Sequence, residues 1–496
     1  MKYTSTRGMI GEVTAAEAVT NGLAPDGGLY VPCEFPSLSA DDIKLLCGMD
    51  YSGRASFIMA RFLEGFSADE IETYCKAAYS KDNFGAHPAP VVKLADDLSI
   101  LELWHGPTCA FKDMALQFLP FLLSASLKKC GEERTACILV ATSGDTGKAA
   151  LEGFRDVSGT KIVVFYPEEG VSRIQKLQMT TQEGENVAVC AVKGNFDHAQ
   201  TGVKQIFSDT GFASLTDRNS MFLSSANSIN WGRLLPQICY YFSAYCDMVS
   251  AGTISLGEKI NICVPTGNFG NILASYYAKK VGLPVAKFIC ASNSNRVLTD
   301  FINTGVYDRN REFYQTISPS MDILISSNVE RLLFDMTGND AGYVCDCMKN
   351  LSENGRYALR PAEARLLSHT FEGIFTDDAR TKDTIKRIFE EQGYLIDTHT
   401  AVGFDGYERY RKESGDKTPA LIVSTASPYK FASSVLEALT GREYEPAPEV
   451  LAMLAELTGT EIPKPLEGLS SKPERFKLSI DPADMKETLR DLLSLK

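Results

Sequence analysis

The sequence has no excess of positive charge and no membrane-length apolar run. Its 50 Lys and Arg residues face 63 Asp and Glu residues, which gives a net charge of −13. Nucleic-acid-binding proteins normally carry a basic patch, so this balance argues against a nucleic-acid partner. No uninterrupted apolar run reaches the roughly 20 residues of a membrane span, and the first residues contain no apolar signal-peptide core. We therefore expect a soluble, cytoplasmic protein without a membrane partner.

Residues at the spacing of a metal site are also lacking. The 5 histidines and 13 cysteines are scattered, and an odd number of cysteines cannot all pair within one chain. The closest pair, Cys345 and Cys347, has no second pair at the spacing typical of zinc sites. His105 and His399 adjoin motifs described below, but isolated histidines are more often structural than metal-binding. We predict free thiols in a reducing compartment and no metal.

From residue 97 onward, apolar strand-like runs alternate with helix-like runs. Continuous apolar runs are typical of parallel strands that are buried on both faces. The alternation predicts an α/β architecture with parallel sheets, in which ligands bind beyond the carboxyl ends of the strands. The predicted strands are Ser99–Trp104, Ala136–Ala141, Lys161–Tyr166, Val187–Val192, Met221–Ser224, Ile260–Val264, Lys287–Ala291 and Ala420–Val423. The predicted helices include Lys148–Arg155, Gly202–Ser208, Trp231–Met248 and Leu273–Val281.

The flanking segments suggest three parts. We predict an N-terminal domain over residues 1–95, with a tight turn at Pro25–Gly28 and helices between residues 40 and 80. A catalytic region over 96–440 would contain two α/β subdomains, the smaller at roughly 113–220. A polar insertion at 300–345 would cover the site. Residues 441–496 would form a C-terminal arm that packs on the catalytic region and ends in an amphipathic helix.

The first motif, His105–Asp113, lies between a strand-like run and a helix-like run. Partial desolvation at the mouth of a helix would lower the pKa of Lys112 and make its amine a better nucleophile toward an aldehyde. A surface lysine in the first turn of a helix is the alternative. Lys112 by itself favours the surface-lysine interpretation. The remaining motifs, described next, favour the nucleophilic lysine instead.

The second motif, Thr142–Lys148, follows a predicted strand and is rich in glycine and hydroxyl side chains. Backbone N–H groups in such a turn can bind an anion, although an N-capped helix explains the motif equally well. The motif differs from a nucleotide P-loop, because Thr142 replaces the first glycine and Ala149 replaces the final Ser or Thr. A nucleotide kinase is therefore disfavoured.

The third motif, Ile262–Asn271, indicates an anion site more strongly. A buried strand runs into a Gly-x-x-Gly turn that opens a helix and contains no acidic residue. Backbone amides and the helix dipole would bind a phosphate monoester there. The motif is not the dinucleotide fingerprint, so NAD is disfavoured.

Two further segments are weaker signals. Ser224–Arg233 places amide and hydroxyl donors and an arginine at a helix start, which indicates either a second anion site or a capped helix. Ile422–Phe431 offers a hydroxyl at the carboxyl end of a strand and by itself predicts only a turn.

Together these segments resemble the threonine synthase family, whose members use pyridoxal phosphate and have the tryptophan-synthase-β fold, or fold type II. The most specific part is His-Gly-Pro-Thr-x-Ala-Phe-Lys-Asp, and the N-terminal part is similar to the longer branch found in fungi and many bacteria. Ser427 is one departure, because this branch more often has histidine there. The similar segments are Tyr3–Gly8, Gly22–Pro32, His105–Asp113, Thr142–Gly147, Ser225–Arg233, Thr266–Asn271 and Thr425–Phe431.

The resemblance implies parallel or mixed sheets flanked by helices, and a role for each motif. Lys112 would bond to the cofactor aldehyde, Asp145 would approach the ring hydroxyl, and Thr425 would hydrogen-bond the pyridine nitrogen. The cofactor phosphate would be bound by Gly267, Asn268, Phe269, Gly270 and Asn271. Candidates for the carboxylate and phosphate of the substrate are Thr108, Ser143, Thr146, Asn227, Ser228, Asn230 and Arg233.

The implied reaction is the last step of threonine biosynthesis. It converts O-phospho-L-homoserine and water into L-threonine and phosphate by γ-elimination and β-addition of water, with Lys112 as general base at the substrate α-carbon. Two alternatives remain open. One is a pyridoxal-phosphate-dependent phospho-lyase that releases a keto acid, and the other is an inactive ligand-binding relative, against which the retention of Lys112 argues. We expect a monomer or a homodimer whose partner is this small-molecule substrate.

Overall fold

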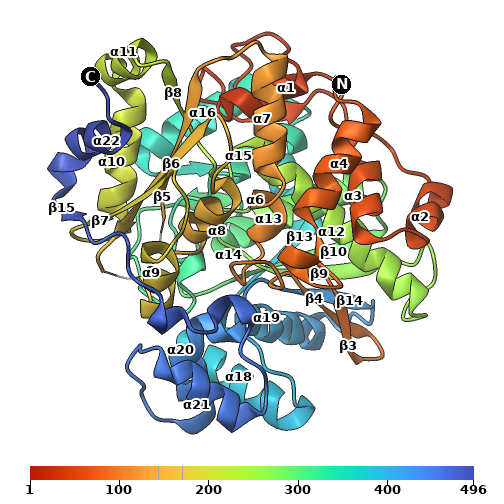
Figure 1. The fold of residues 1–496 in the computed structure, drawn as a ribbon. Helices are drawn as coiled ribbons and strands as arrows, with labels where there is room; N and C mark the ends of the chain where they lie inside the picture. Colours follow the sequence, from red (N-terminus) through yellow and green to blue (C-terminus); the bar gives the residue numbers. More distant parts are fainter. Residues whose placement is uncertain (143, 170) are drawn as a thin grey trace.

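The computed structural model describes residues 1–142, 144–169 and 171–496, and it contains two large sheets (Figure 1). The larger sheet has the strand order β13-β10-β9-β14-β4-β3. Its strands are parallel except β3, which pairs antiparallel with β4 at one edge. Their bounds are β3 Val91–Ala95, β4 Leu98–Glu102, β9 Ile260–Pro265, β10 Val285–Ser292, β13 Phe371–Phe375 and β14 Ala420–Ser424.

The smaller sheet has the order β15-β7-β6-β5-β8, and all of its strand pairs are parallel. Four of its strands are consecutive in the chain, whereas β15 comes from near the C-terminus. The bounds are β5 Thr135–Ala141, β6 Thr160–Pro167, β7 Val187–Val192, β8 Met221–Ser224 and β15 Ser479–Ile480. The C-terminal segment therefore completes a sheet that residues 135–224 begin.

Helices make up most of the remaining chain, and none within the described ranges is long and apolar enough to cross a membrane. Those up to the smaller sheet are α1 Ala15–Asn21, α2 Ala40–Cys47, α3 Tyr51–Met59, α4 Ala68–Ala78, α5 Lys81–Phe84, α6 Asp113–Leu116 and α7 Leu119–Lys129. Those within and after that sheet are α8 Asp145–Phe154, α9 Arg173–Thr180, α10 Phe196–Ser208, α11 Thr210–Arg218, α12 Trp231–Ser250, α13 Gly270–Val281 and α14 Val297–Thr304. The remaining ones are α15 Val329–Met336, α16 Ala341–Asn354, α17 Pro361–Thr370, α18 Asp378–Gln392, α19 Thr398–Ser414, α20 Ala432–Thr440, α21 Glu449–Thr458 and α22 Met485–Leu493.

Strand β5 shows why these sheets need apolar residues at every position. Ile138 and Val140 share a core with α8, whereas Cys137 and Leu139 share another core with α10 and α22. Successive side chains of a strand point to opposite faces, and here helices cover both faces. Figure 1 shows α10 and α22 on the outer side of this sheet. A continuous apolar run is the expected sequence pattern for such a strand.

The residues before β3 form a helical layer against α12. Helices α1, α2 and α4 each begin with a capping box, in which Thr14, Ser39 or Ser67 accepts a backbone N–H from three residues ahead. The short strands β1 (Tyr3–Ser5) and β2 (Tyr30–Pro32) pair antiparallel. The predicted helices between residues 40 and 80 are present, as is the turn that precedes β2.

All eight predicted strands are present, with ends that differ by no more than two residues. The helix starts were less accurate. The chain begins α8 at Asp145 and α10 at Phe196, whereas we predicted Lys148 and Gly202. Asn195 caps α10 by accepting the backbone N–H of His198, and Phe196, Ala199 and Val203 lie at helical spacing in one core, so the earlier start was already indicated by the sequence pattern.

Candidate active site

Lys112 lies where the carboxyl ends of two neighbouring strands of the larger sheet meet. The backbone N–H of Leu103, just after β4, donates to the carbonyl of Ser424 at the end of β14 (3.0 Å). The N–H of Phe111 then donates to the carbonyl of Thr425 (2.8 Å), and α6 begins one residue after Lys112. These bonds hold the loop that carries Lys112 against Thr425, at the sheet edge where α/β folds bind ligands.

Asp145, the first residue of α8, faces Lys112 from the smaller sheet. Its Oδ2 lies 3.6 Å from the Lys112 amine, and its Oδ1 lies 2.7 Å from the amine of Lys430. Burial by itself raises the pKa of the Asp145 carboxyl, but the two ammonium groups more than offset burial and keep that pKa well below its usual range. Asp145 is therefore an ionised carboxylate shared by two lysines.

The Lys112 amine is mostly enclosed, with 12% of its side chain exposed. Burial lowers its pKa, the charge of Asp145 opposes that effect, and the charges of Lys430 and Arg233 lower the pKa further. A lysine with a lowered pKa keeps a larger fraction of its amine neutral, which is the form that attacks carbonyls and accepts protons.

Lys430 was not among the predicted site residues, and two further unpredicted residues complete the surroundings of Asp145. Gln175 of α9 donates its amide to Oδ1 (2.9 Å), and the hydroxyl of Ser320 donates to Oδ2 (3.3 Å). Ser320 belongs to the 3₁₀ turn Pro319–Met321, inside the insertion that we expected to cover the site. Its backbone N–H donates to Nε2 of His399 (3.2 Å), whose Nδ1 contacts Asp397 (2.8 Å), so His399 has a structural role here.

The turn that begins at Gly267 forms a backbone cradle at the N-terminus of the 12-residue helix α13. Phe269 takes a left-handed conformation with φ of 60°, which turns successive amides toward one side. Within the part of the chain that the structure describes, the N–H groups from Gly267 to Gly270 donate to no protein acceptor. The buried amide nitrogen of Asn271 likewise has no partner in that part. These free donors and the helix dipole fit a phosphate group.

The same 3₁₀ turn connects this cradle to the lysine. A Cβ built on Gly267 would lie 2.7 Å from the Ser320 carbonyl oxygen, so the two backbones are in contact. The side chains of Ser326 and Asn328 donate to the carbonyls of Gly267 (2.8 Å) and Asn268 (2.9 Å). The cradle, Asp145 and Lys112 thus belong to one site.

Arg233, in the first turn of α12, is the remaining cation of the site. It is 3% exposed, its Nη1 donates to the carbonyl of Ala226, and its Nε has no partner among the described residues. Burial lowers its pKa to about 10. A buried guanidinium without a carboxylate is costly, and such a group is suited to an anionic ligand.

The other predicted substrate contacts differ in their surroundings. Ser228 lies beside the cradle, with its Cβ 3.8 Å from the Cβ position built on Gly270. Asn227 is half-buried in the same turn, and Thr146 is half-buried in the first turn of α8. Ser143 lies outside the described residues.

Thr108 and Asn230 are engaged inside the protein. The Thr108 hydroxyl donates to Asp113 (2.6 Å). The Asn230 oxygen caps α12, while its amide donates to the carbonyl of Val19 (3.1 Å). Both side chains are buried and bonded, so the geometry gives no support to a direct substrate contact for either. Lys148 is similarly engaged, because it pairs with Glu152 (2.9 Å).

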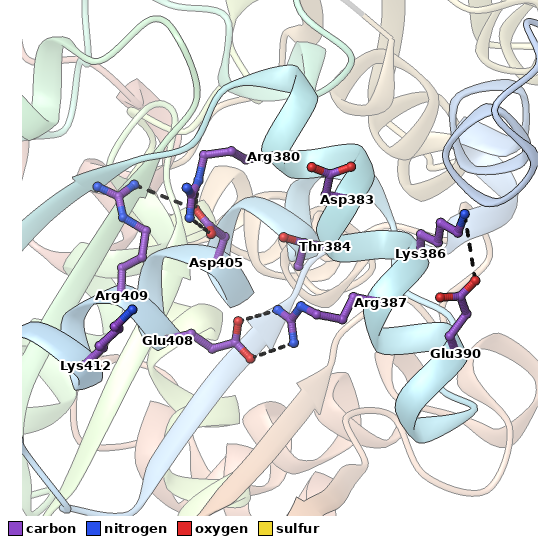
Figure 2. Close-up of a pocket in the computed structure, with 10 residues that line it drawn as sticks. All are labelled: Arg380, Asp383, Thr384, Lys386, Arg387, Glu390, Asp405, Glu408, Arg409 and Lys412. Carbon is purple, nitrogen blue, oxygen red and sulfur yellow. Dashed lines mark hydrogen bonds and ion pairs between the residues drawn. The ribbon is translucent and has the colours of Figure 1, made fainter.

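A surface hollow of about 510 Å³ lies elsewhere, between α18 and α19. Figure 2 shows that its charged side chains face one another as pairs, such as Arg387 with Glu408 and Lys386 with Glu390. Exposed pairs of this kind contribute little free energy. None of the predicted site residues lines this hollow, so it is separate from the candidate active site.

Comparison with known proteins is consistent with this geometry. Three family models match the chain: "Threonine synthase N terminus" over residues 2–79, "Pyridoxal-phosphate dependent enzyme" over 87–367 and "Threonine synthase, C-terminal" over 400–488. The threonine synthase of Methylobacillus glycogenes is 38% identical over 96% of this chain and 97% of its own length. Human threonine synthase-like 1 is 43% identical over 86% of this chain, and the match spans only 58% of that longer protein.

Solved structures agree over nearly the whole chain. The pyridoxal-phosphate-bound threonine synthase from Brucella melitensis has a TM-score of 0.87 and 36% identity, with 99% of both chains covered. The yeast threonine synthase has a TM-score of 0.88 and 34% identity, again with 99% of both chains covered. These matches extend over the two sheets, the N-terminal layer and the C-terminal segment.

Proposed function

This chain belongs to the threonine synthase family of pyridoxal-phosphate-dependent enzymes, and from that premise we propose that it converts O-phospho-L-homoserine and water into L-threonine and phosphate. The observation that carries this proposal is the Lys112 amine beside the shared carboxylate of Asp145, in one site with an anion cradle and a second buried cation. The reaction needs one nucleophilic amine and two anion sites, one for the cofactor phosphate and one for the phosphate of the substrate.

The residues of the site fit pyridoxal phosphate. The free amides from Gly267 to Gly270 and the amide of Asn271 would bind its phosphate, and Lys112 would bond to its aldehyde. The ring hydroxyl neighbours the aldehyde, so Asp145, 3.6 Å from the Lys112 amine, is in the right place to contact it. Thr425, adjacent to Lys112 at the end of β14, would face the pyridine nitrogen. When bound, the cofactor supplies an electron sink for charge that develops on the substrate.

The protein's own groups account for the rest of the proposed chemistry. A mostly enclosed Lys112 with a lowered pKa provides a neutral amine to take a proton from the substrate α-carbon and to return one later. Arg233, with Ser228 and Asn227 in the turn before it, would bind the substrate phosphate and hold it during departure. The enclosure also restricts water at the reacting carbon atoms.

Replacing Gly267 with alanine is expected to weaken cofactor binding by about tenfold or more. The new Cβ would lie 2.7 Å from the Ser320 carbonyl, so the cradle or the 3₁₀ turn must move, and such overpacking costs about 1–3 kcal/mol. The dissociation constant of pyridoxal phosphate, measured by absorbance titration, checks this. Gly11→Ala is the control, because nothing lies within 4 Å of a Cβ built there. Equal affinity in both variants would remove Gly267 from the cradle.

The proposed function is tested in two steps. We expect a yellow protein in which borohydride fixes the cofactor on the peptide containing Lys112, and then release of threonine and phosphate from O-phospho-L-homoserine in equal amounts. Release of phosphate with 2-ketobutyrate instead would identify a phospho-lyase. A colourless protein that cannot be reconstituted with pyridoxal phosphate would indicate a ligand-binding relative. The cytoplasm remains the proposed location, and a monomer or homodimer the proposed assembly.

A further inference from the structure

The 3₁₀ turn Pro428–Phe431 brings a second lysine into the site from far along the chain. Lys430 is fully buried, with 0% exposure. Its amine lies 2.7 Å from Oδ1 of Asp145 and donates to the carbonyl of Thr108 (2.8 Å). A buried ammonium is costly unless it is paired and hydrogen-bonded, and Lys430 has both kinds of partner.

The turn that carries Lys430 is fixed against the loop that carries Lys112. The Ser427 N–H donates to the Cys109 carbonyl (3.1 Å), and the Ser427 hydroxyl accepts the Tyr429 N–H (3.3 Å). The Tyr429 hydroxyl in turn donates to the carbonyl of Thr460 (2.9 Å). Ser427, the position where this branch of the family more often has histidine, therefore caps the turn. The backbone holds Lys430 in one place relative to Lys112.

We propose that Lys430 is a positioning residue that acts through Asp145: its buried ammonium occupies one oxygen of the carboxylate, so that only the other oxygen is left to Lys112 and the Lys112 amine stays available as a neutral base. The inference rests on the proposed function for the base role of Lys112. It concerns the charge state of that amine and not the identity of the product.

The geometry divides the Asp145 carboxylate between the two lysines. Lys430 and Gln175 bind Oδ1 at 2.7 and 2.9 Å, whereas Lys112 stands 3.6 Å from Oδ2. The shorter distance makes Lys430 the main counter-ion. Gly144 allows the close approach of Gln175, because a Cβ built on Gly144 would lie 2.5 Å from the Gln175 side chain.

The charges that act on Lys112 are opposed in sign. Asp145 stabilises the protonated amine, whereas Lys430 and Arg233 disfavour it. Lys430 is itself within the electrostatic reach of Asp113, Lys148 and the thiol of Cys109. Removing Lys430 leaves Lys112 as the only cation that contacts Asp145 in the described part of the chain, so the pKa of Lys112 must rise. Removing the charge of Asp145 must lower that pKa.

The opposite directions of these two shifts in the pKa of Lys112 distinguish an electrostatic role of Lys430 from a structural one. A variant that merely loosens the site would hydrate Lys112 and move its lowered pKa up toward the ordinary value, whichever residue was changed. A decrease in Asp145→Asn, together with an increase in Lys430→Met, requires the shared carboxylate. We expect each change to be about one pH unit, the size typical of one nearby charge.

The experiment measures the rate at which acetic anhydride modifies Lys112 as a function of pH, in the full-length, cofactor-free chain, with mass spectrometry of the Lys112 peptide. Lys430→Met should raise the apparent pKa, Asp145→Asn should lower it, and Lys430→Arg should keep it near the wild-type value. Lys386→Met, a surface lysine beside Glu390, is the matched control and should change nothing. In the holoenzyme, the acid side of the kcat–pH profile should move in the same directions.

If Lys430→Met does not fold, the comparison of Asp145→Asn with the double variant Asp145→Asn/Lys430→Met replaces it. The double variant has no buried unpaired carboxylate at position 145, and its Lys112 pKa should be the higher of the two. Equal pKa values in that comparison, or an increase in Asp145→Asn, would overturn the proposal. The labelling experiment uses no substrate, so it does not depend on the proposed function. If the protein forms no threonine but the pKa of Lys112 shifts as expected in the variants, only the proposed function is refuted.

Discussion

Replacement of Lys112 by alanine is expected to abolish threonine formation, with a loss of roughly a thousandfold or more, while the protein still folds. The loss follows because this one amine is both the proposed anchor for the cofactor aldehyde and the proposed base. The fold should survive because Asp145 keeps Lys430 and Gln175 as partners, so no buried carboxylate is left unpaired.

Two measurements check this expectation: threonine production by the purified variant, and its thermal unfolding beside the wild type. The variant should still bind pyridoxal phosphate weakly through the Gly267–Asn271 cradle, without the covalent adduct that borohydride traps. Lys386→Ala, at the surface hollow of Figure 2, controls for the loss of a lysine elsewhere. Substantial threonine formation by Lys112→Ala would reject the assignment of the site.

Replacement of Arg233 by alanine is expected to raise the Michaelis constant for O-phospho-L-homoserine by about a hundredfold. The guanidinium is buried with an unpartnered Nε, and it has no carboxylate partner among the described residues, so the substrate phosphate would be its main counter-ion. A hydrogen bond to a charged group contributes about 1.5–3 kcal/mol, and each 1.4 kcal/mol corresponds to about tenfold in affinity. Inhibition by inorganic phosphate should weaken in parallel.

The stability of Arg233→Ala should stay at the wild-type level or increase. Arg233 is desolvated and forms no ion pair with a carboxylate in the described part of the chain, so its removal takes away an unfavourable contribution to the native state. Steady-state kinetics with thermal unfolding measures both effects. Arg387→Ala, which breaks exposed pairs with Glu408 and Glu391, is the matched control. An unchanged Michaelis constant together with unchanged phosphate inhibition would exclude Arg233 from the anion site.

Much of the candidate site could be predicted because each of its motifs lies within a short stretch of consecutive residues. Lys112 follows a buried strand within a highly specific motif, and the Gly267–Asn271 turn needs only a strand, two glycines and a helix start to present its amides. Asp145 and Arg233 likewise stand at helix starts that follow strands. Each of these features is contained in about ten consecutive residues, and the burial of both faces of the sheets makes the strands themselves continuous apolar runs.

Other parts could not be predicted, since they depend on which distant segments meet. Lys430 lies within a segment that by itself indicated only a turn, Gln175 lies on an ordinary polar helix, and Ser320 lies in an insertion. Nothing in their neighbours shows that all three converge on Asp145. Asn230 shows the reverse, because it stands in a motif, yet a tertiary contact to Val19 engages its side chain. Thr108 is engaged locally, by Asp113 of its own motif.

The sequence alone determined the two sheet-forming regions and indicated the lysine and the proposed phosphate-binding turn, because strand burial and helix N-termini impose patterns over a few neighbouring residues. Only the tertiary structure decided that one carboxylate is shared by two lysines, and which polar side chains face the site. Those features result from packing between β4, α8, α9 and β14 and their loops. The partners of Asp145 are separated from it by 30 to 285 residues, and a hydrogen bond or ion pair across such distances leaves no periodic signal in the chain.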